Sequence, residues 1–339
     1  MKAWIYYILI SVIFITGVST GIYFNHSEKP TKPNKPAITP PSVETNYTYV
    51  SLGDSIAEGY GLPSTKDENG FVPGSYADSL KNKLSAKHSK FKAFNYAQAG
   101  QTSTDLLNIL TTLSGTDLSA ENYQKKQNIQ AANTITVCIG ANDILGPAQN
   151  NLASFIMSSD ATSLIDALDT GLTTFQTNFP EILSKLRGLN ANAQIVFSNI
   201  YNPYKEFVGV TDKSVAITGF PISIDSAKFN LIGQMSESYI DSGNFSYNAQ
   251  SSKNIENGLN QIIESTITAD TKCSLLDVKD SFDDYFVANS KYDIVQCNIL
   301  SQTSVALNSI MNSIDPHPTQ EGHNLIDSLF DNNLTNSLG

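Results

Sequence analysis

The feature that most constrains the fold is a series of five short apolar runs separated by longer stretches of mixed polarity. The runs are rich in β-branched and aromatic residues and largely free of charge, as strands are when both faces of a sheet are covered. They comprise residues 48–52, 91–97, 134–139, 194–199 and 274–278. Between the third and fourth runs, apolar residues recur at three- and four-residue steps, which indicates a helix. The pattern predicts βαβ crossovers and a parallel sheet sandwiched by helices.

The N-terminal 45 residues do not belong to this pattern. Residues 3–24 carry no charge and are long enough to cross a bilayer, so we expect an export signal or an uncleaved membrane anchor, with the anchor slightly favoured. Residues 25–45 contain five prolines among Lys and Thr and are typical of a semi-rigid stalk. We expect residues 46–339 to form a single domain that is extracellular or on the cell surface. Lysines just beyond the apolar segment leave the opposite orientation open.

The charge balance excludes one class of partner. The chain has 32 acidic and 21 basic residues, a formal charge of -11, and no long Lys/Arg run. We therefore do not expect a protein whose main task is to bind nucleic acid.

The cysteines and acidic residues give no sign of a metal site. Three cysteines without CxxC spacing are unlike structural zinc or thioredoxin-type motifs. Cys138 is typical of a core residue, whereas Cys273 and Cys297 either pair or remain free thiols. The aspartates at 277, 280, 283 and 284, with His317 and His323, match no zinc or EF-hand spacing. We expect a solvated acidic face there, with no metal.

Four polar blocks lie where a ligand site is expected. In a parallel α/β sheet the ligand site lies outside the carboxyl ends of the strands, and three of the blocks directly follow or end the first three predicted strands. The fourth block lies near the C-terminus. The blocks are Ser-Leu-Gly-Asp-Ser-Ile at 51–56, Asn-Tyr-Ala-Gln-Ala-Gly at 95–100, Ile-Gly-Ala-Asn-Asp at 139–143 and Ile-Asp-Pro-His-Pro at 314–318.

In that order the blocks resemble those of the GDSL esterases, the SGNH hydrolase family. Ser55, Gly100, Asn142 and His317 fall on the four residues that give the family its name. The resemblance implies a flavodoxin-like three-layer α/β/α sandwich with a central five-stranded parallel sheet. It also implies a serine ester hydrolase that works through an acyl-enzyme on Ser55 and needs no cofactor. Residues 136–143 and 200–203 look most like the lysophospholipase-like members from Gram-positive bacteria.

The proposed nucleophile needs a base. A serine hydroxyl is a poor nucleophile near neutral pH, so it requires a histidine and an acceptor that fixes the imidazole tautomer. His317 is the candidate base. The family places the acidic partner three residues before the histidine, but that position is Ile314 here and the nearest acid is Asp315, two residues before. We expect Asp315 to orient His317, with a backbone carbonyl or another loop acid as the alternative.

The resemblance also implies an oxyanion hole. Its donors would be the backbone N–H groups of Ser55 and Gly100 and the side-chain amide of Asn142. Taken alone, Gly100 is equally typical of a turn and Asn142 of a helix cap. Asp54 and Asp143 are more typical of turn and capping residues than of acids or bases.

The four polar blocks do not define the substrate. The candidates are lipid or lysophospholipid acyl esters and small acyl esters, with an O-acetylesterase of cell-wall carbohydrate as the runner-up. A non-catalytic surface binding protein on the same fold is the rival from another class. We expect selectivity to come from long loops at 57–74, 146–162, 204–225 and 279–313.

Overall fold

The computed structural model describes residues 46–248 and 252–333. The predicted anchor and stalk lie outside these residues. Within the described ranges, none of the helices combines the length and apolar character needed to cross a membrane.

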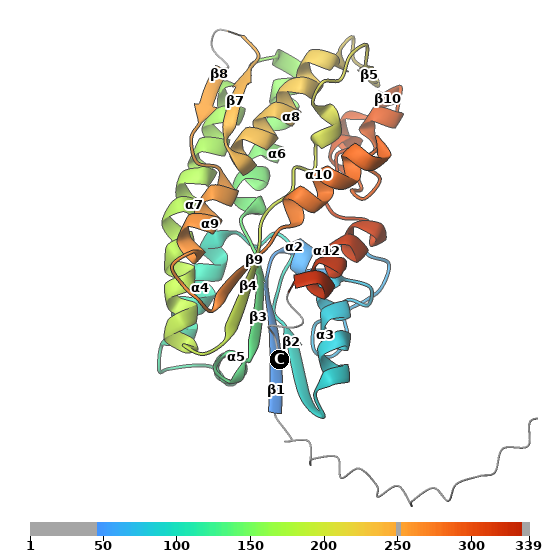
Figure 1. Cartoon of the computed structure of the whole chain (residues 1–339). Helices are drawn as coiled ribbons and strands as arrows, with labels where there is room; N and C mark the ends of the chain where they lie inside the picture. Colours follow the sequence, from blue (N-terminus) through green and yellow to red (C-terminus); the bar gives the residue numbers. More distant parts are fainter. Residues whose placement is uncertain (1–45, 249–251, 334–339) are drawn as a thin grey trace, which may run out of the picture. The chain divides into compact units, whose positions relative to one another are not determined.

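The domain is built on a central sheet of five parallel strands (Figure 1). In the order β2-β1-β3-β4-β9, its strands are Lys90–Asn95, Asn46–Gly53, Thr134–Cys138, Gln194–Ser198 and Cys273–Leu276. These are the five predicted runs, with ends shifted by a few residues. The order is that of flavodoxin-like folds, in which the crevice between the first and third strands is where connections diverge to opposite faces. The predicted α/β/α sandwich is therefore confirmed.

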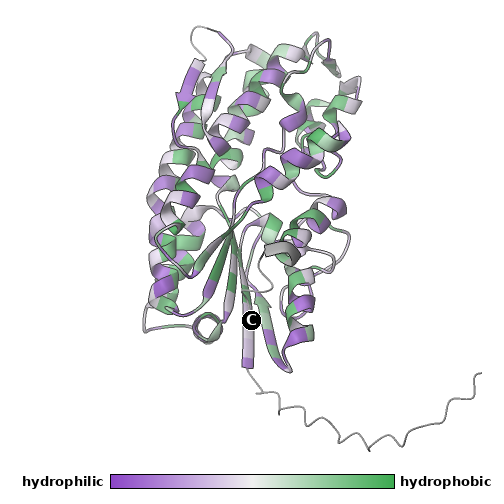
Figure 2. Ribbon diagram, in the orientation of Figure 1, coloured by the Kyte–Doolittle hydropathy of each residue, from purple (hydrophilic) through white to green (hydrophobic). Residues whose placement is uncertain are grey.

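Side chains on β1 alternate between the two faces of the sheet, and each face packs against its own layer of helices. Tyr47 and Tyr49 pack into one core cluster, whereas Val50 and Leu52 pack into the other, because successive strand side chains point to opposite faces. The first cluster joins the sheet to α3 (Tyr76–Lys87), α10 (Val278–Asn289) and α12 (Gln320–Asn333). The second joins it to α4 (Ser103–Ser114), α5 (Ala120–Ala131), α7 (Thr162–Leu189) and α9 (Leu259–Ile267). In Figure 2 green, the colour of hydrophobic residues, predominates in β4 and β9, whereas β1 and β2 also carry white and purple stretches.

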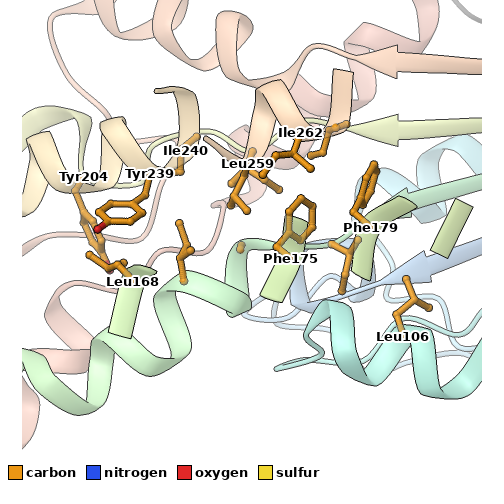
Figure 3. Close-up of a cluster of buried hydrophobic side chains, with 14 of the residues drawn as sticks. Leu106, Leu168, Phe175, Phe179, Tyr204, Tyr239, Ile240, Leu259 and Ile262 are labelled. Carbon is orange, nitrogen blue, oxygen red and sulfur yellow. The ribbon is translucent and has the colours of Figure 1, made fainter. Parts of the chain in front are cut away.

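The predicted helix between the third and fourth strands is α7, which continues through Pro180. Its buried stripe includes Leu168, Phe175 and Phe179, which Figure 3 shows among side chains from neighbouring helices. The helix packs against α4, α6 and α9, so it ties the layer beside the sheet to the region beyond the strand ends.

The region beyond the strand ends is more ordered than predicted. Residues 146–162, predicted as a loop, lie mostly in α6 (Ala141–Ser158), and α10 occupies the start of the predicted loop 279–313. That prediction was wrong because Pro147 and several Asn and Ser residues obscure the helical spacing of α6, which tolerates the proline inside it. The other elements there are η1 (Lys205–Phe207), β5 (Ser214–Ile217), β6 (Ser223–Asp225), α8 (Ser226–Asp241), β7 (Gly243–Ser246), β8 (Ser252–Ile255), η2 (Ile299–Ser301), β10 (Ser304–Val305), η3 (Leu307–Ser309) and α11 (Ile310–Ser313).

Two small sheets in this region had no counterpart in the sequence predictions. β10, β5 and β6 form one, and β7 pairs with β8 in the other. All three cysteines are free thiols, so Cys273 and Cys297 do not pair.

Candidate active site

Ser55 lies at the tight turn between β1 and the short helix α2 (Ser55–Glu58). Gly53 ends the strand with φ 128°, and a Cβ there would lie 1.9 Å from the carbonyl oxygen of Cys138 on β3, so only glycine fits. Asp54 caps α2, as predicted, because its Oδ1 accepts the N–H of Ile56 at 3.0 Å. Burial raises the pKa of the Asp54 carboxyl group to about 7, although the hydrogen bond from Ile56 opposes the shift.

His317 bridges Ser55 and Asp315. Its Nε2 lies 2.9 Å from Oγ of Ser55, and its Nδ1 lies 2.6 Å from Oδ1 of Asp315. A carboxylate accepts hydrogen bonds, so Nδ1 carries the proton and Nε2 accepts the hydroxyl proton of Ser55. The predicted nucleophile, Ser55, and the predicted base, His317, are therefore in hydrogen-bond contact although 262 residues separate them in the chain.

The two-residue offset of Asp315 works through a local turn. Its Oδ1 accepts the backbone N–H of His317 at 3.0 Å as well as the ring N–H, so the side chain folds back over Pro316. Partial burial raises the pKa of Asp315, but the hydrogen bonds from the His317 ring and backbone outweigh burial and hold the pKa below its usual value. The carboxylate is therefore ionised at neutral pH, as an acceptor for Nδ1–H must be.

Sequence reasoning missed the residues that hold this turn in place. The hydroxyl of Tyr201 donates to the carbonyl oxygen of Pro316 at 2.6 Å, and that of Tyr204 donates to the carbonyl oxygen of Ile314 at 3.2 Å. Backbone N–H of Gln296 donates to the carbonyl oxygen of His317 at 2.9 Å. Tyr201 falls in the block 200–203, whose resemblance to the family was the only available signal.

Tyr60 covers the histidine from the solvent side. Its ring centroid lies 4.8 Å from that of His317, and the residue is 52% exposed. The imidazole is thereby placed between an aromatic ring and the turn that carries it. An imidazolium formed during proton transfer would be stabilised by the face of such a ring.

Three residues that line one cavity, Ser55, Gly100 and Asn142, offer N–H donors. Within the described residues, no acceptor is bonded to the backbone N–H of Ser55 or of Gly100. Asn142 donates one amide hydrogen to the carbonyl oxygen of Gln101 at 3.0 Å, which leaves its second hydrogen available. Gly100 has φ 81° in a turn, a conformation that favours glycine. Asn142 is not a helix cap, because Gly140 holds the cap position of α6.

Asp143 has a larger structural role than the capping role predicted for it. Its carboxylate is buried and accepts both the backbone N–H of Ser103 at 2.8 Å and its hydroxyl at 2.5 Å. Asn178 of α7 donates to the same hydroxyl at 3.1 Å. These bonds tie the loop after β2 to the start of α6 and so fix Gly100 relative to Asn142.

The residues converge on a cavity of about 340 Å³. Ser55, Gly100, Asn142 and His317 line it together with apolar side chains from α6 and from the loop after β4. This size suits a small organic group. Its lining combines N–H donors with apolar side chains, so the cavity can hold a carbonyl group against the donors and an apolar group beside them.

Two other predicted features lie away from this cavity. His323 is fully buried in α12, where its Nδ1 accepts the N–H of Tyr76 at 3.4 Å and burial lowers its pKa to about 4. The expected solvated acidic face is partly paired, since Asp283 contacts Lys205 and Lys279. Among the described residues, no group of three His, Cys, Asp or Glu side chains could hold a metal ion.

Comparison with known proteins identifies the family to which the chain belongs. Residues 51–325 match the model of the GDSL-like Lipase/Acylhydrolase family. The chain belongs to this family. The match covers all four polar blocks, so the resemblance drawn from them is confirmed.

Individual relatives are distant. The uncharacterized protein YpmR of Bacillus subtilis strain 168 is 25% identical over 204 residues, covering 60% of this chain and 68% of YpmR. A phospholipase A1 from Streptomyces albidoflavus NA297 has a TM-score of 0.50 at 14% identity, covering 85% of this chain and 99% of that one. A lipase from a goat rumen metagenome, Lip_vut3, has a TM-score of 0.49 at 14% identity, covering 84% and 96%. The likeness to the phospholipase shows the shared fold.

Family membership supports an ester hydrolase of the GDSL type.

Proposed function

We propose that the protein hydrolyses carboxylic esters through an acyl-enzyme on Ser55. The observation that carries this proposal is the unbroken relay from Asp315 through His317 to Ser55, at 2.6 and 2.9 Å, opening into a cavity with three N–H donors. An idle binding protein would have no need for such a relay. No step requires a metal or a cofactor.

In the first half of the reaction, His317 Nε2 takes the hydroxyl proton as Ser55 Oγ attacks the ester carbonyl carbon. Negative charge moves to the carbonyl oxygen, where the N–H groups of Ser55, Gly100 and Asn142 stabilise it. His317 then gives its proton to the leaving alcohol oxygen as the carbon–oxygen bond breaks. Asp315 holds the ring in the reactive tautomer and stabilises the imidazolium, without taking the proton itself.

The second half repeats these steps with water. His317 takes a proton from a water molecule as its oxygen attacks the acyl carbon, and the tetrahedral intermediate again places its charge among the three donors. The bond to Ser55 Oγ breaks, and His317 returns the proton to that oxygen. The products are a carboxylic acid and the free enzyme.

The test is a hydrolysis screen of the full-length protein in mild detergent, on p-nitrophenyl esters beside acetylated xylan. We expect ester hydrolysis that Ser55→Ala reduces to a small residual rate, because the nucleophile is lost and only substrate binding and the oxyanion donors remain. Ser119→Ala, which removes only the cap of α5, is the matched control and should remain active. Equal activity in Ser55→Ala and the wild type would contradict the proposal.

We also propose that the domain, residues 46–339, works outside the cell on its N-terminal anchor and stalk. The uncharged apolar segment 3–24 and the proline-rich segment 25–45 support this location. Protease added to intact cells should release the domain. Protection in intact cells and cleavage only after lysis would favour a cytoplasmic location.

A further inference from the structure

A second cavity adjoins the one at Ser55. It lies between α6, α7 and α8, and it shares Leu145 and Gln149 with the catalytic cavity. We call it the side slot. Eleven side chains line it, among them Ala148 and Leu152 of α6, Leu168 of α7, Tyr204 before η1 and Ser236 of α8. Figure 3 labels two of them, Leu168 and Tyr204, whose side chains lie close together.

One helix links the oxyanion donors to this slot. Asn142, Leu145 and Gln149 are spaced three and four residues apart on α6, so they share a face, and all three line the catalytic cavity. Ala148 and Leu152 continue the same face into the slot. A substrate carbonyl held at Asn142 therefore has an apolar path along α6, about 15 Å from Asn142 to Leu152 at 1.5 Å per residue.

The lining selects against sugars. Nine of the eleven side chains have no free hydrogen-bonding group, since the only polar ones are Gln149, Tyr204 and Ser236 and the Tyr204 hydroxyl is already bonded to Ile314. Gln149 is exposed at the shared mouth. A sugar ring placed in the slot would leave most of its hydroxyl groups without partners, which is unfavourable.

The slot is also narrow. Its volume is about 40 Å³, compared with about 340 Å³ for the catalytic cavity. A bulky or branched group cannot follow this path without moving α6 or α8, whereas a single methylene chain is slim and apolar. The shape and the lining therefore fit the same chemical group.

We propose that the side slot binds the acyl chain of the substrate, which makes the protein selective for esters of unbranched acids longer than acetic acid. This proposal rests on the proposed ester hydrolysis at Ser55 and specifies its substrate class. Each methylene buried in the slot should raise kcat/KM by about fourfold, since burial of a CH₂ group is worth roughly that factor in an equilibrium constant. The alcohol half of the ester lies on the other side of the carbonyl and should be recognised far less strictly.

The decisive experiment compares two Ala→Phe substitutions on the same helix of the full-length protein. Ala148→Phe fills the slot, whereas Ala153→Phe adds the same ring on the exposed face of α6. We expect the wild type to prefer p-nitrophenyl octanoate over acetate by at least tenfold in kcat/KM. Ala148→Phe should lose at least tenfold on octanoate and less than twofold on acetate. Ala153→Phe should match the wild type on both.

A milder variant protects the test against misfolding. Ser236 Oγ is buried in the slot wall and has no hydrogen-bond partner among the described residues. Ser236→Ala should therefore fold normally and raise kcat/KM for octanoate by about twofold to fourfold while leaving acetate unchanged.

A second series varies the alcohol. Acetate esters of ethanol, butanol and octanol should differ by less than threefold in kcat/KM. A strong preference for octyl acetate would assign the slot to the alcohol and overturn the proposal. Equal rates on octanoate and acetate, or acetylated xylan as the only good substrate, would also overturn it while leaving ester hydrolysis at Ser55 intact. Failure on every ester, with no reaction at Ser55, would instead reject the proposed function and this inference with it.

Discussion

The two ends of α6 present two kinds of recognition. Its first turn carries Asn142 and Asp143, whose polar atoms are held by Gln101 and Ser103 at hydrogen-bond distances. Its later turns carry Leu145, Ala148 and Leu152, which line the side slot. The position of the first turn is constrained by the reaction, because an oxyanion needs hydrogen-bond donors at set positions. The later turns can change side chains without disturbing those positions, so they are where substrate preference can vary.

The largest loss of activity should come from a substitution among the polar catalytic residues. Asp315→Asn should lower kcat by about three to four orders of magnitude, because the asparagine amide can donate to Nδ1 and favour the tautomer whose Nε2 cannot accept a proton. Steady-state kinetics with p-nitrophenyl octanoate measure it. Asp284→Asn, on the exposed face of α10, is the matched control. A loss of only about tenfold would show that another group orients His317.

Asn142→Ala should have a smaller effect on the same step. Loss of one oxyanion donor should reduce kcat by about a hundredfold or more with KM nearly unchanged, since the donor acts mainly in the transition state. Asn108→Ala, on the exposed face of α4, controls for loss of an amide. A raised KM with unchanged kcat would place Asn142 among the binding residues and weaken the division of α6 into two functions.

The two parts of the molecule should also differ in how strongly acid destabilises them. The described segments from α4 to α10 contain no histidine, whereas α12 buries His323 with its pKa lowered to about 4. Between that pKa and the usual value for histidine the unfolded chain binds more protons, so stability is present at neutral pH and is lost as the pH falls through this window. His323→Phe should make the change in unfolding free energy between pH 7.5 and 5.0 smaller by about 2 kcal/mol.

Urea unfolding of the wild type and of His323→Phe at the two pH values measures this difference. Asp54 contributes to the pH dependence with the opposite sign. Its pKa is raised to about 7 in the folded protein, so the stability gained from its protonation is lost as the pH rises. The comparison between the two proteins cancels that contribution. An identical pH dependence in both would mean that His323 is not a source of acid sensitivity.

The sequence was informative wherever a local pattern determines the structure. The five apolar runs identified the sheet, because a strand buried on both faces has few residue types available to it. The four polar blocks located Ser55, Gly100, Asn142 and His317. Asp315 was identified in spite of its altered offset, but the turn that lets its carboxylate reach both the backbone and the ring of His317 became visible only in three dimensions.

What could not be predicted depends on contacts between distant segments. Tyr201 bonds to Pro316 across 115 residues, and no pattern in a single sequence pairs the two. The side slot was missed for another reason. Its walls are apolar side chains at helical spacing, which in the sequence cannot be told from ordinary core, and Pro147 hid the helix that carries half of them.

The most direct test of the account is covalent labelling of the nucleophile. A fluorophosphonate should react with the folded full-length protein, Ser55 Oγ displacing fluoride from phosphorus, because only a serine activated by a base reacts readily with such probes. Peptide mass spectrometry should place the adduct on Ser55, and His317→Ala should remain essentially unlabelled under the same conditions. An adduct on another residue, or no adduct on folded wild-type protein, would contradict the claim that Ser55 and His317 form a working catalytic pair.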